Sequence, residues 1–294
     1  MLDQSWGDRL FNAVNIAMLT IITLIVLYPL VFVLSASISN PEAVLNGAVW
    51  LWPQDINFDA YFKIFNNKDI LIGYGNTILY TVLGTAINVV MTICAAYPLA
   101  RKDLFGRNAI TLLIVFTMFF SGGLIPTYLI IKQLGMLDSI WVMIIPNAVA
   151  VWNIIIMRTF FQQSIPPELE EAAMIDGSSH MQTLLRIVLP LSLPIIAVMV
   201  LFYAVSHWNS YFNALIYLDS RELFPLQLVL REIVIQSDAG DLVKLQSESA
   251  ARMKMTVEGL KYAVLVVANL PVLLLYPFLQ RYFVKGMMIG ALKG

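Results

Sequence analysis

The chain has 294 residues, of which 59% are hydrophobic and 13% are charged, and its mean hydropathy is +0.78. Because soluble domains carry about 25% charged residues, this composition indicates a protein that resides in lipid. The net charge of −1 argues against a nucleic-acid partner. The single cysteine excludes a disulfide framework, and together with only two histidines it cannot form a zinc site.

Six apolar runs reach about 20 residues, the length that a helix needs to cross a bilayer. The runs are continuous rather than alternating, and only helices or closed barrels satisfy every backbone group in lipid. We therefore predict an all-α membrane protein with one domain over residues 1–294 and no internal repeat. The predicted spans are Asn12–Ser35, Ile70–Pro98, Ala109–Ile131, Ile140–Phe161, Pro190–Tyr217 and Gly259–Gln280.

Two apolar features flank the first span. Leu2, Trp6 and Leu10 recur at helical spacing before it, which predicts either a short interfacial helix or an extension of the span itself. Trp50 and Trp52 follow in the first loop, where tryptophan is typical of an anchor at the membrane surface.

The second predicted span carries one polar stripe, whose members recur at steps of three or four residues. Threonine and asparagine commonly form hydrogen bonds between packed membrane helices, and this interpretation is favoured. The alternative is one wall of a hydrated path for cargo. The stripe consists of Thr77, Thr81, Thr85, Asn88 and Thr92.

A polar segment at residues 164–190 interrupts the apolar pattern before the fifth span. Ser164 and the two prolines that follow suit a helix start, and the glutamates at positions 168, 170 and 171 favour the positive end of a helix dipole. Gly177 is predicted to end this helix, because glycine tolerates the left-handed conformation of a C-terminal cap. Ser178 is predicted to cap a second helix that runs to Arg186. The segment is thus an acidic helix–turn–helix outside the membrane.

The fifth predicted span ends in a run of aromatic and amide side chains. Rings that stack on sugar faces and amides that bond hydroxyl groups suit carbohydrate recognition, whereas an aromatic belt at the membrane surface is the alternative. On a continuous helix, residues 209 and 213 share one face, and residues 207 and 211 share another. The candidate residues of the cargo path are His207, Trp208, Asn209, Tyr211 and Asn213.

Several features of a motor or an enzyme are missing from the sequence. No Gly-x-x-x-x-Gly-Lys-Ser/Thr loop is present to hold nucleotide phosphates. The interiors of the spans hold His207 and almost no other ionisable side chain, which argues against coupling to protons or sodium. No arrangement of catalytic residues is recognisable. The sequence therefore predicts a non-catalytic protein whose energy comes from a partner.

The polar segment resembles a known motif. Glu171-Ala172-Ala173, followed by Gly177 and by Ile187-Val188-Leu189-Pro190, matches the EAA loop of the permease subunits of bacterial ABC importers. Other segments resemble the carbohydrate-uptake permeases, and within them the branch that includes the bacterial alginate importer. These segments are Ser121–Tyr128, Met157–Phe161, Trp208-Asn209 and Val284–Gly294.

The resemblance implies that the polar segment lies in the cytoplasm and inserts into a cleft on an ATPase subunit. The resemblance thus implies that both termini are cytoplasmic. The positive-inside rule does not decide this orientation by itself, because Lys and Arg are distributed evenly between the two sides. Glu170 and Arg186 are expected to form ion pairs. The alternative is a solvated loop helix that is capped for its own stability. The coupling residues implied are Glu170, Glu171, Ala172, Ala173, Asp176, Gly177, Arg186 and Pro190.

The resemblance also implies the partners of an importer in the bacterial inner membrane. These are a second permease, two ATPase subunits that bind ATP and Mg²⁺, an extracytoplasmic sugar-binding protein, and an oligo- or polysaccharide cargo such as alginate. The chain itself is expected to hold no cofactor and to work by alternating access. The alternatives are an ABC importer for a non-sugar solute and an ion-coupled carrier.

A hydrophilic loop at residues 218–258 is expected on the outer side. In maltose-type relatives, a loop at this place in the second permease reaches into the binding protein and helps to displace the sugar. Its tip is predicted to be small and polar. The residues assigned to the tip are Gln236, Ser237, Asp238 and Gly240.

Overall fold

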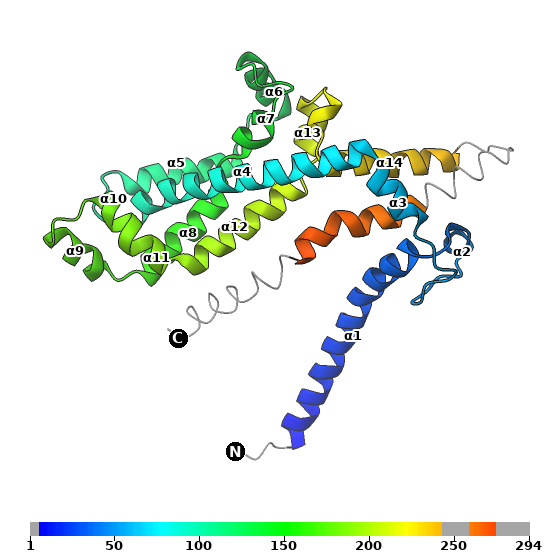
Figure 1. Cartoon of the computed structure of the whole chain (residues 1–294). Coiled ribbons are helices and arrows are strands. Elements are labelled where there is room, and N and C mark those ends of the chain that lie inside the picture. The colour runs from blue at the N-terminus through cyan, green and yellow to red at the C-terminus, as the bar shows by residue number, and fades with distance from the viewer. Residues whose placement is uncertain (1–5, 243–258, 275–294) are drawn as a thin grey trace. The chain divides into compact units, whose positions relative to one another are not determined.

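The structure, a computed structural model, describes residues 6–242 and 259–274, and every regular element within these ranges is a helix (Figure 1). The predicted all-α class is therefore confirmed. The chain divides into two compact units, one formed by residues 1–68 and 230–270 and the other by residues 69–229 and 271–294. The single permease domain stays a prediction.

The first unit is built around one long apolar helix, α1. This helix runs without a break from Trp6, so Trp6 and Leu10 extend the first span rather than form a separate interfacial helix, whereas Leu2 lies outside the described residues. The Tyr61 hydroxyl lies 2.8 Å from the Ser37 hydroxyl and links α3 to the end of α1. This unit contains α1 (Trp6–Ser37), α2 (Pro41–Leu45), α3 (Asp59–Asn66) and most of the helix Gly259–Leu274.

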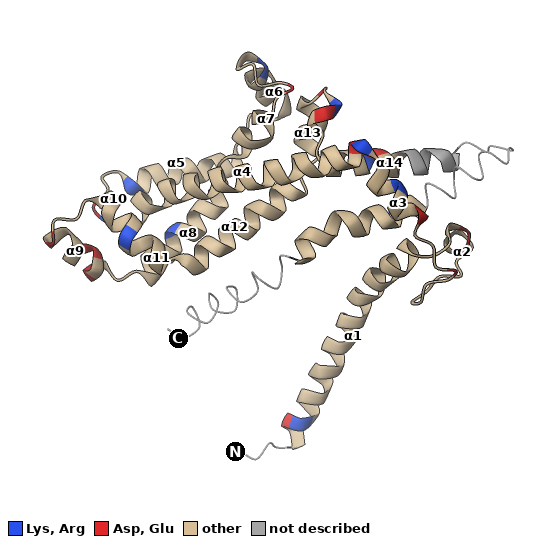
Figure 2. Ribbon diagram, in the orientation of Figure 1, with Lys and Arg blue, Asp and Glu red and all other residues tan. Residues whose placement is uncertain are grey.

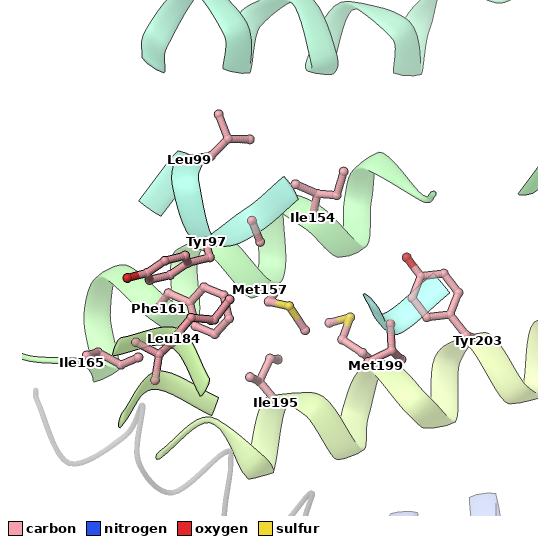
Figure 3. Packing of buried hydrophobic residues seen from close by; sticks show 13 residues of the cluster. Tyr97, Leu99, Ile154, Met157, Phe161, Ile165, Leu184, Ile195, Met199 and Tyr203 are labelled. Carbon is pink, nitrogen blue, oxygen red and sulfur yellow. The ribbon is translucent and has the colours of Figure 1, made fainter. Parts of the chain in front are cut away.

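The second unit packs around the 33-residue helix α4 (Lys68–Ala100). Helices α8 (Val151–Ser164) and α12 (Leu193–Trp208) lie beside it, and their apolar side chains meet in one buried cluster (Figure 3). Met157 and Met199 are fully buried in this cluster. The apolar residues from which the spans were predicted therefore also form a packed protein core.

The third predicted span is two helices rather than one. Helix α5 (Arg107–Phe119) and helix α6 (Leu124–Gln133) meet at an angle of 110°. The bend falls at Gly122-Gly123, where Gly123 has a φ of +87°, a conformation that side-chain-bearing residues rarely adopt. The Gly122-Gly123 pair was the available sign of this bend within the apolar run.

The fourth and fifth predicted spans are also interrupted. Helix α7 (Trp141–Ile144) continues into η1 (Ile145–Asn147), and the axis then bends by 52° before α8 begins. The helical run that ends with α11 (Leu189–Leu191) meets α12 at 83°, and α12 stops three residues before α13 (Phe212–Tyr217).

The described helices therefore support a membrane protein without fixing its number of spans. Two of them, α1 and α4, are long and apolar enough to cross a membrane alone, and up to five spans result if each bent pair counts as one. Figure 2 shows that charged side chains gather near helix ends, while the long helices are uncharged over most of their length. The six-span count stays a prediction.

The expected outer loop contains a helix in its first half. Residues 226–242 form α14 (Leu226–Leu242), after the short helix η3 (Arg221–Leu223). Leu226, Leu228 and Val229 are buried, so burial of apolar side chains explains why this stretch is helical. The predicted tip residues Gln236, Ser237, Asp238 and Gly240 lie on α14 rather than in an irregular turn, and residues 243–258 fall outside the described residues.

A carboxylate joins two loops of the second unit. Asp138, in the turn before α7, accepts hydrogen bonds from the Ser220 hydroxyl at 2.5 Å, the Ser220 N–H at 2.8 Å and the Asp219 N–H at 3.0 Å. These bonds, the Ser220 hydroxyl foremost, lower the pKa of Asp138 below its usual value. The charged form of this side chain therefore holds the turn against the segment that precedes η3.

We expect this junction to weaken in acid. A carboxylate whose pKa is lowered by folding contributes stability above its unfolded pKa, about 3.9, and loses it as the pH falls through the folded value. The melting temperature of the wild type should exceed that of Asp138→Asn at neutral pH, and the difference should shrink below about pH 4. A difference that stays constant over this range would contradict the role of the charge.

Candidate functional site

The acidic half of the polar segment forms a short, exposed helix, α9 (Pro167–Ile175). Pro167 occupies its first turn, as predicted, but Ser164 is the last residue of α8 and does not cap α9. Glu168 and Glu171 are exposed, and Ala173 is the buried residue of the helix. Figure 1 shows α9 at the end of the group formed by α4, α8 and α10. A partner therefore has access to most of its surface.

The turn after α9 ends the helix as predicted. Gly177 has a φ of +80°, and its N–H donates to the Met174 carbonyl at 3.0 Å. The Ser178 N–H donates to the Ala173 carbonyl at 2.9 Å, which completes a Schellman motif. A side chain at position 177 would strain this backbone although the surrounding space is open.

The second helix of the segment begins one residue later than expected. Ser179, rather than Ser178, caps α10 (His180–Thr183), and Gln182 completes a capping box. The helical run continues through η2 (Leu184–Val188), a π-helical turn, into α11. It carries Arg186 and Pro190, both exposed.

The ion pair of Glu170 differs from the expected arrangement. Its carboxylate lies 3.4 Å from the Arg101 guanidinium, just beyond the end of α4, while Arg186 is exposed on η2. Arg101 is not among the coupling residues predicted from the sequence. The sequence contains no spacing that links it to Glu170, because Arg101 lies in the turn after α4 and Glu170 lies on α9.

The polar stripe of α4 faces other helices, as the favoured interpretation predicted. Thr77, Thr85, Asn88 and Thr92 are buried, and Thr81 is half-buried. The Thr77 hydroxyl accepts from the Leu226 N–H at 2.8 Å, at the start of α14. The Thr92 and Tyr203 hydroxyls lie 2.7 Å apart, which links α4 to α12. Hydrogen bonds between packed elements therefore account for Thr77, Asn88 and Thr92, whereas the Thr81 and Thr85 hydroxyls have no hydrogen-bond partner among the described residues.

Asn88 of the stripe and Tyr203 on α12 form hydrogen bonds with the backbone at the break between η1 and α8. Asn88 Nδ2 donates to the Asn147 carbonyl at 2.5 Å, where η1 ends. The Ala150 N–H, at the start of α8, donates to the Tyr203 hydroxyl at 3.4 Å. Backbone groups that a broken helix leaves unpaired in lipid require such partners. The break is thus held by side chains from α4 and α12.

The predicted cargo-path residues do not share one environment. His207 and Trp208 are buried: the imidazole Nε2 lies 2.7 Å from Asn88 Oδ1, and the indole meets the Tyr74 ring edge-on. Asn209 and Tyr211 are exposed. Because α12 ends at Trp208 and α13 begins at Phe212, the shared faces expected for residues 207–213 are not formed. Asn213, on α13, is half-buried.

This chain is similar to two proteins of Bacillus subtilis over nearly its whole length. A scan against models of protein families finds no match. The chain is 43% identical over 289 residues to the polygalacturonan/rhamnogalacturonan transport system permease protein YtcP of Bacillus subtilis (strain 168), covering 98% of this chain and 99% of the relative. It is 42% identical over 288 residues to the protein LplC of the same organism, covering 98% and 96%.

One solved structure is also similar over nearly the whole chain. It is a crystal structure of a bacterial ABC transporter involved in the import of the acidic polysaccharide alginate. The match has a TM-score of 0.85 and 36% sequence identity, and it covers 96% of this chain and 100% of that chain.

Proposed function

The chain belongs to the permease subunits of sugar ABC importers, and from this premise we propose that α9 and the Gly177 turn are the contact through which an ATPase subunit drives it. The observation that carries the proposal is the exposed, acidic helix α9, closed by a Schellman turn at a glycine. A short helix of this kind offers a rigid projection with little of its own surface committed to packing.

The partners follow from the same assignment. A second permease would complete the membrane pathway, two ATPase subunits would bind ATP and Mg²⁺, and an extracytoplasmic binding protein would deliver the sugar. Glu171, Ala172 and the Gly177 turn would enter the ATPase cleft, with the surrounding residues at its rim. This chain performs no chemistry and needs no cofactor of its own.

The proposed topology has six spans in the inner membrane, with both termini and α9 in the cytoplasm. It counts each bent pair of helices as one span, which gives five, and takes the apolar helix Gly259–Leu274 as part of the sixth. Interrupted helices are tolerated in membranes where neighbouring side chains satisfy the freed backbone groups. The side chains of Asn88 and Tyr203 provide this at the break before α8. Alternating access would then be a movement of packed helices driven from α9.

The proposed cargo is an oligo- or polysaccharide with acidic sugars. One protein similar to this chain is named for the transport of polygalacturonan and rhamnogalacturonan, and another is described as involved in the import of alginate. Both descriptions support a polymer of uronic acids as the cargo. A thermal-shift screen of the cognate binding protein tests this. Stabilisation by oligogalacturonate or alginate fragments is expected, and stabilisation by neutral sugars alone would contradict the acidic cargo.

The coupling role is tested by Gly177→Trp in the reconstituted importer. The variant should insert into the membrane, because the turn is exposed and nothing lies within 4 Å of an added Cβ. Sugar uptake should be lost, and ATP hydrolysis should no longer respond to the loaded binding protein. Gly47→Trp is the matched control, since Gly47 also has a positive φ of +68° and open space but lies in the loop after α2. Full uptake by Gly177→Trp would refute the proposal.

A further inference from the structure

The end of α4 is fastened to α8 by hydrogen bonds to its last carbonyls. Carbonyls in the final turn of a helix have no partner within the helix. Arg158 Nε donates to the Leu99 carbonyl at 2.9 Å, and Gln162 Nε2 donates to the Ala100 carbonyl at 3.3 Å. Both donors come from α8, so the end of α4 has a fixed position relative to α8.

Arg101 follows this fastened end and is itself held firmly. Its side chain is only 9% exposed. The guanidinium donates to both carboxylate oxygens of Asp103, at 2.9 and 2.8 Å, and to the Tyr97 hydroxyl at 3.2 Å. The hydrogen bond with Asp103 raises the pKa of Arg101 and lowers that of Asp103. Asp103 and Tyr97 therefore hold the guanidinium in place independently of α9.

The remaining interaction of this guanidinium reaches across to α9. Arg101 Nη1 lies 3.4 Å from Glu170 Oε2, and the Glu170 side chain is 22% exposed. A pocket of 540 Å³ separates α9 from the ends of α4 and α8, with Phe161 and Met174 among its lining residues. The ion pair bridges the edge of this hollow. It thus connects α9 to the core at a place where apolar packing is incomplete.

We propose that Arg101 is the positioning residue that ties α9 to α4, so that a displacement of α9 is passed along α4 to its buried polar stripe. This inference rests on the proposed function, because it takes α9 as the helix that an ATPase subunit moves. The stripe contacts α12 and the break before α8, through Thr92 and Asn88. A long helix whose side chains bond to α12 and to the break before α8 is a physical route for such coupling.

The strength of the Arg101–Glu170 ion pair depends on how firmly Arg101 is already held by other residues. Exposed ion pairs contribute little because two long side chains lose freedom when they meet in water. Arg101 has already lost that freedom to Asp103 and Tyr97, so only Glu170 must be ordered. The pair is therefore expected to contribute more than a typical surface pair.

A double-mutant cycle tests the proposal in the reconstituted importer. Arg101→Gln and Glu170→Gln should each lower sugar transported per ATP hydrolysed by roughly threefold to tenfold, the scale expected for residues in one network. The double variant should lose no more than either single variant. Glu168→Gln is the control, since this exposed glutamate on the same helix forms no ion pair among the described residues. Losses that multiply in the double variant would overturn the pairing.

A distance measurement separates this inference from the proposed function. Spin labels at positions 175 on α9 and 108 on α5, in a chain with Cys94 replaced by alanine, report the placement of α9. The distance distribution should be narrow in the parent chain and broader in both single variants and in the double variant. Equal widths in all four proteins would overturn the tie. Uptake by Gly177→Trp, with the widths as expected, would instead refute the coupling role of α9.

Discussion

Replacing Gly84 by leucine is expected to lower the melting temperature of the protein sharply. Gly84 lies on α4 directly opposite the His207 imidazole, and a Cβ added there would collide with three atoms of the ring. Both positions are buried, and His207 is held by Asn88 at 2.7 Å. Because the ring is buried and hydrogen-bonded, α4 and α12 must separate or the hydrogen bond must break.

The size of the effect follows from overpacking. Extra methylenes in a packed interior typically cost about 1–3 kcal/mol, and occasionally more, whereas replacing a helical glycine gains only about 1 kcal/mol. The collision should therefore prevail, and the free energy of unfolding should fall. Thermal unfolding of the purified protein in detergent measures the change.

Gly75→Leu provides the matched control. Gly75 lies on the same helix, but it is exposed and nothing lies within 4 Å of an added Cβ. This substitution should leave stability unchanged or raise it slightly. Combining Gly84→Leu with His207→Ala should restore part of the loss by removing the ring. A melting temperature for Gly84→Leu equal to that of Gly75→Leu would contradict the close approach of α4 and α12.

The elements that the sequence predicted well are those decided by local chemistry. Helices α1 and α4 follow from uninterrupted apolar runs, and α9 ends at Gly177 because a left-handed cap requires glycine there. Each of these signals lies within a few residues of the feature that it predicts. The second helix is capped by Ser179 rather than by the predicted Ser178. Local signals do not distinguish the two positions, since either serine is chemically suited to be the cap.

The bends escaped the sequence prediction for a physical reason. A run of apolar residues has the same composition whether its helix is straight or broken, because lipid and protein interior favour the same side chains. Pro146, which has no N–H to donate, and the polar Asn147 beside it were the available signs of the break before α8. The prediction that residues 207–213 share helix faces was wrong for the same reason, because it assumed a continuous helix.

The candidate site was only partly predictable. The acidic helix and its turn are local, whereas the ion pair between Arg101 and Glu170 joins the turn after α4 to α9, two elements that are distant in the sequence. Arg158 gave a usable signal, since a cation within an apolar run needs a buried partner. That partner is a backbone carbonyl at the end of α4, which no residue pattern identifies. Tertiary contacts of this kind require the fold.

The polar stripe leads to a second large effect, expected for Asn88→Leu. The Asn88 amide Nδ2 donates to the Asn147 carbonyl, and its Oδ1 accepts a hydrogen bond from His207 Nε2. Leucine has a similar size but leaves both groups without this partner. A polar group left unpaired in a buried site costs about 1–3 kcal/mol. The melting temperature should fall, and hydrogen exchange at the N–H groups of residues 148–150 should become faster.

Thr85→Val separates this effect from a general loss of polarity on α4. Thr85 lies one turn from Asn88, is buried, and its hydroxyl has no hydrogen-bond partner among the described residues. Valine keeps its shape and removes an unpaired polar atom, so stability should be unchanged or slightly higher. The contrast between the two variants identifies hydrogen bonding to the break, rather than a polar surface, as the purpose of this part of the stripe. Equal stability of Asn88→Leu and Thr85→Val would show that the break before α8 does not depend on α4.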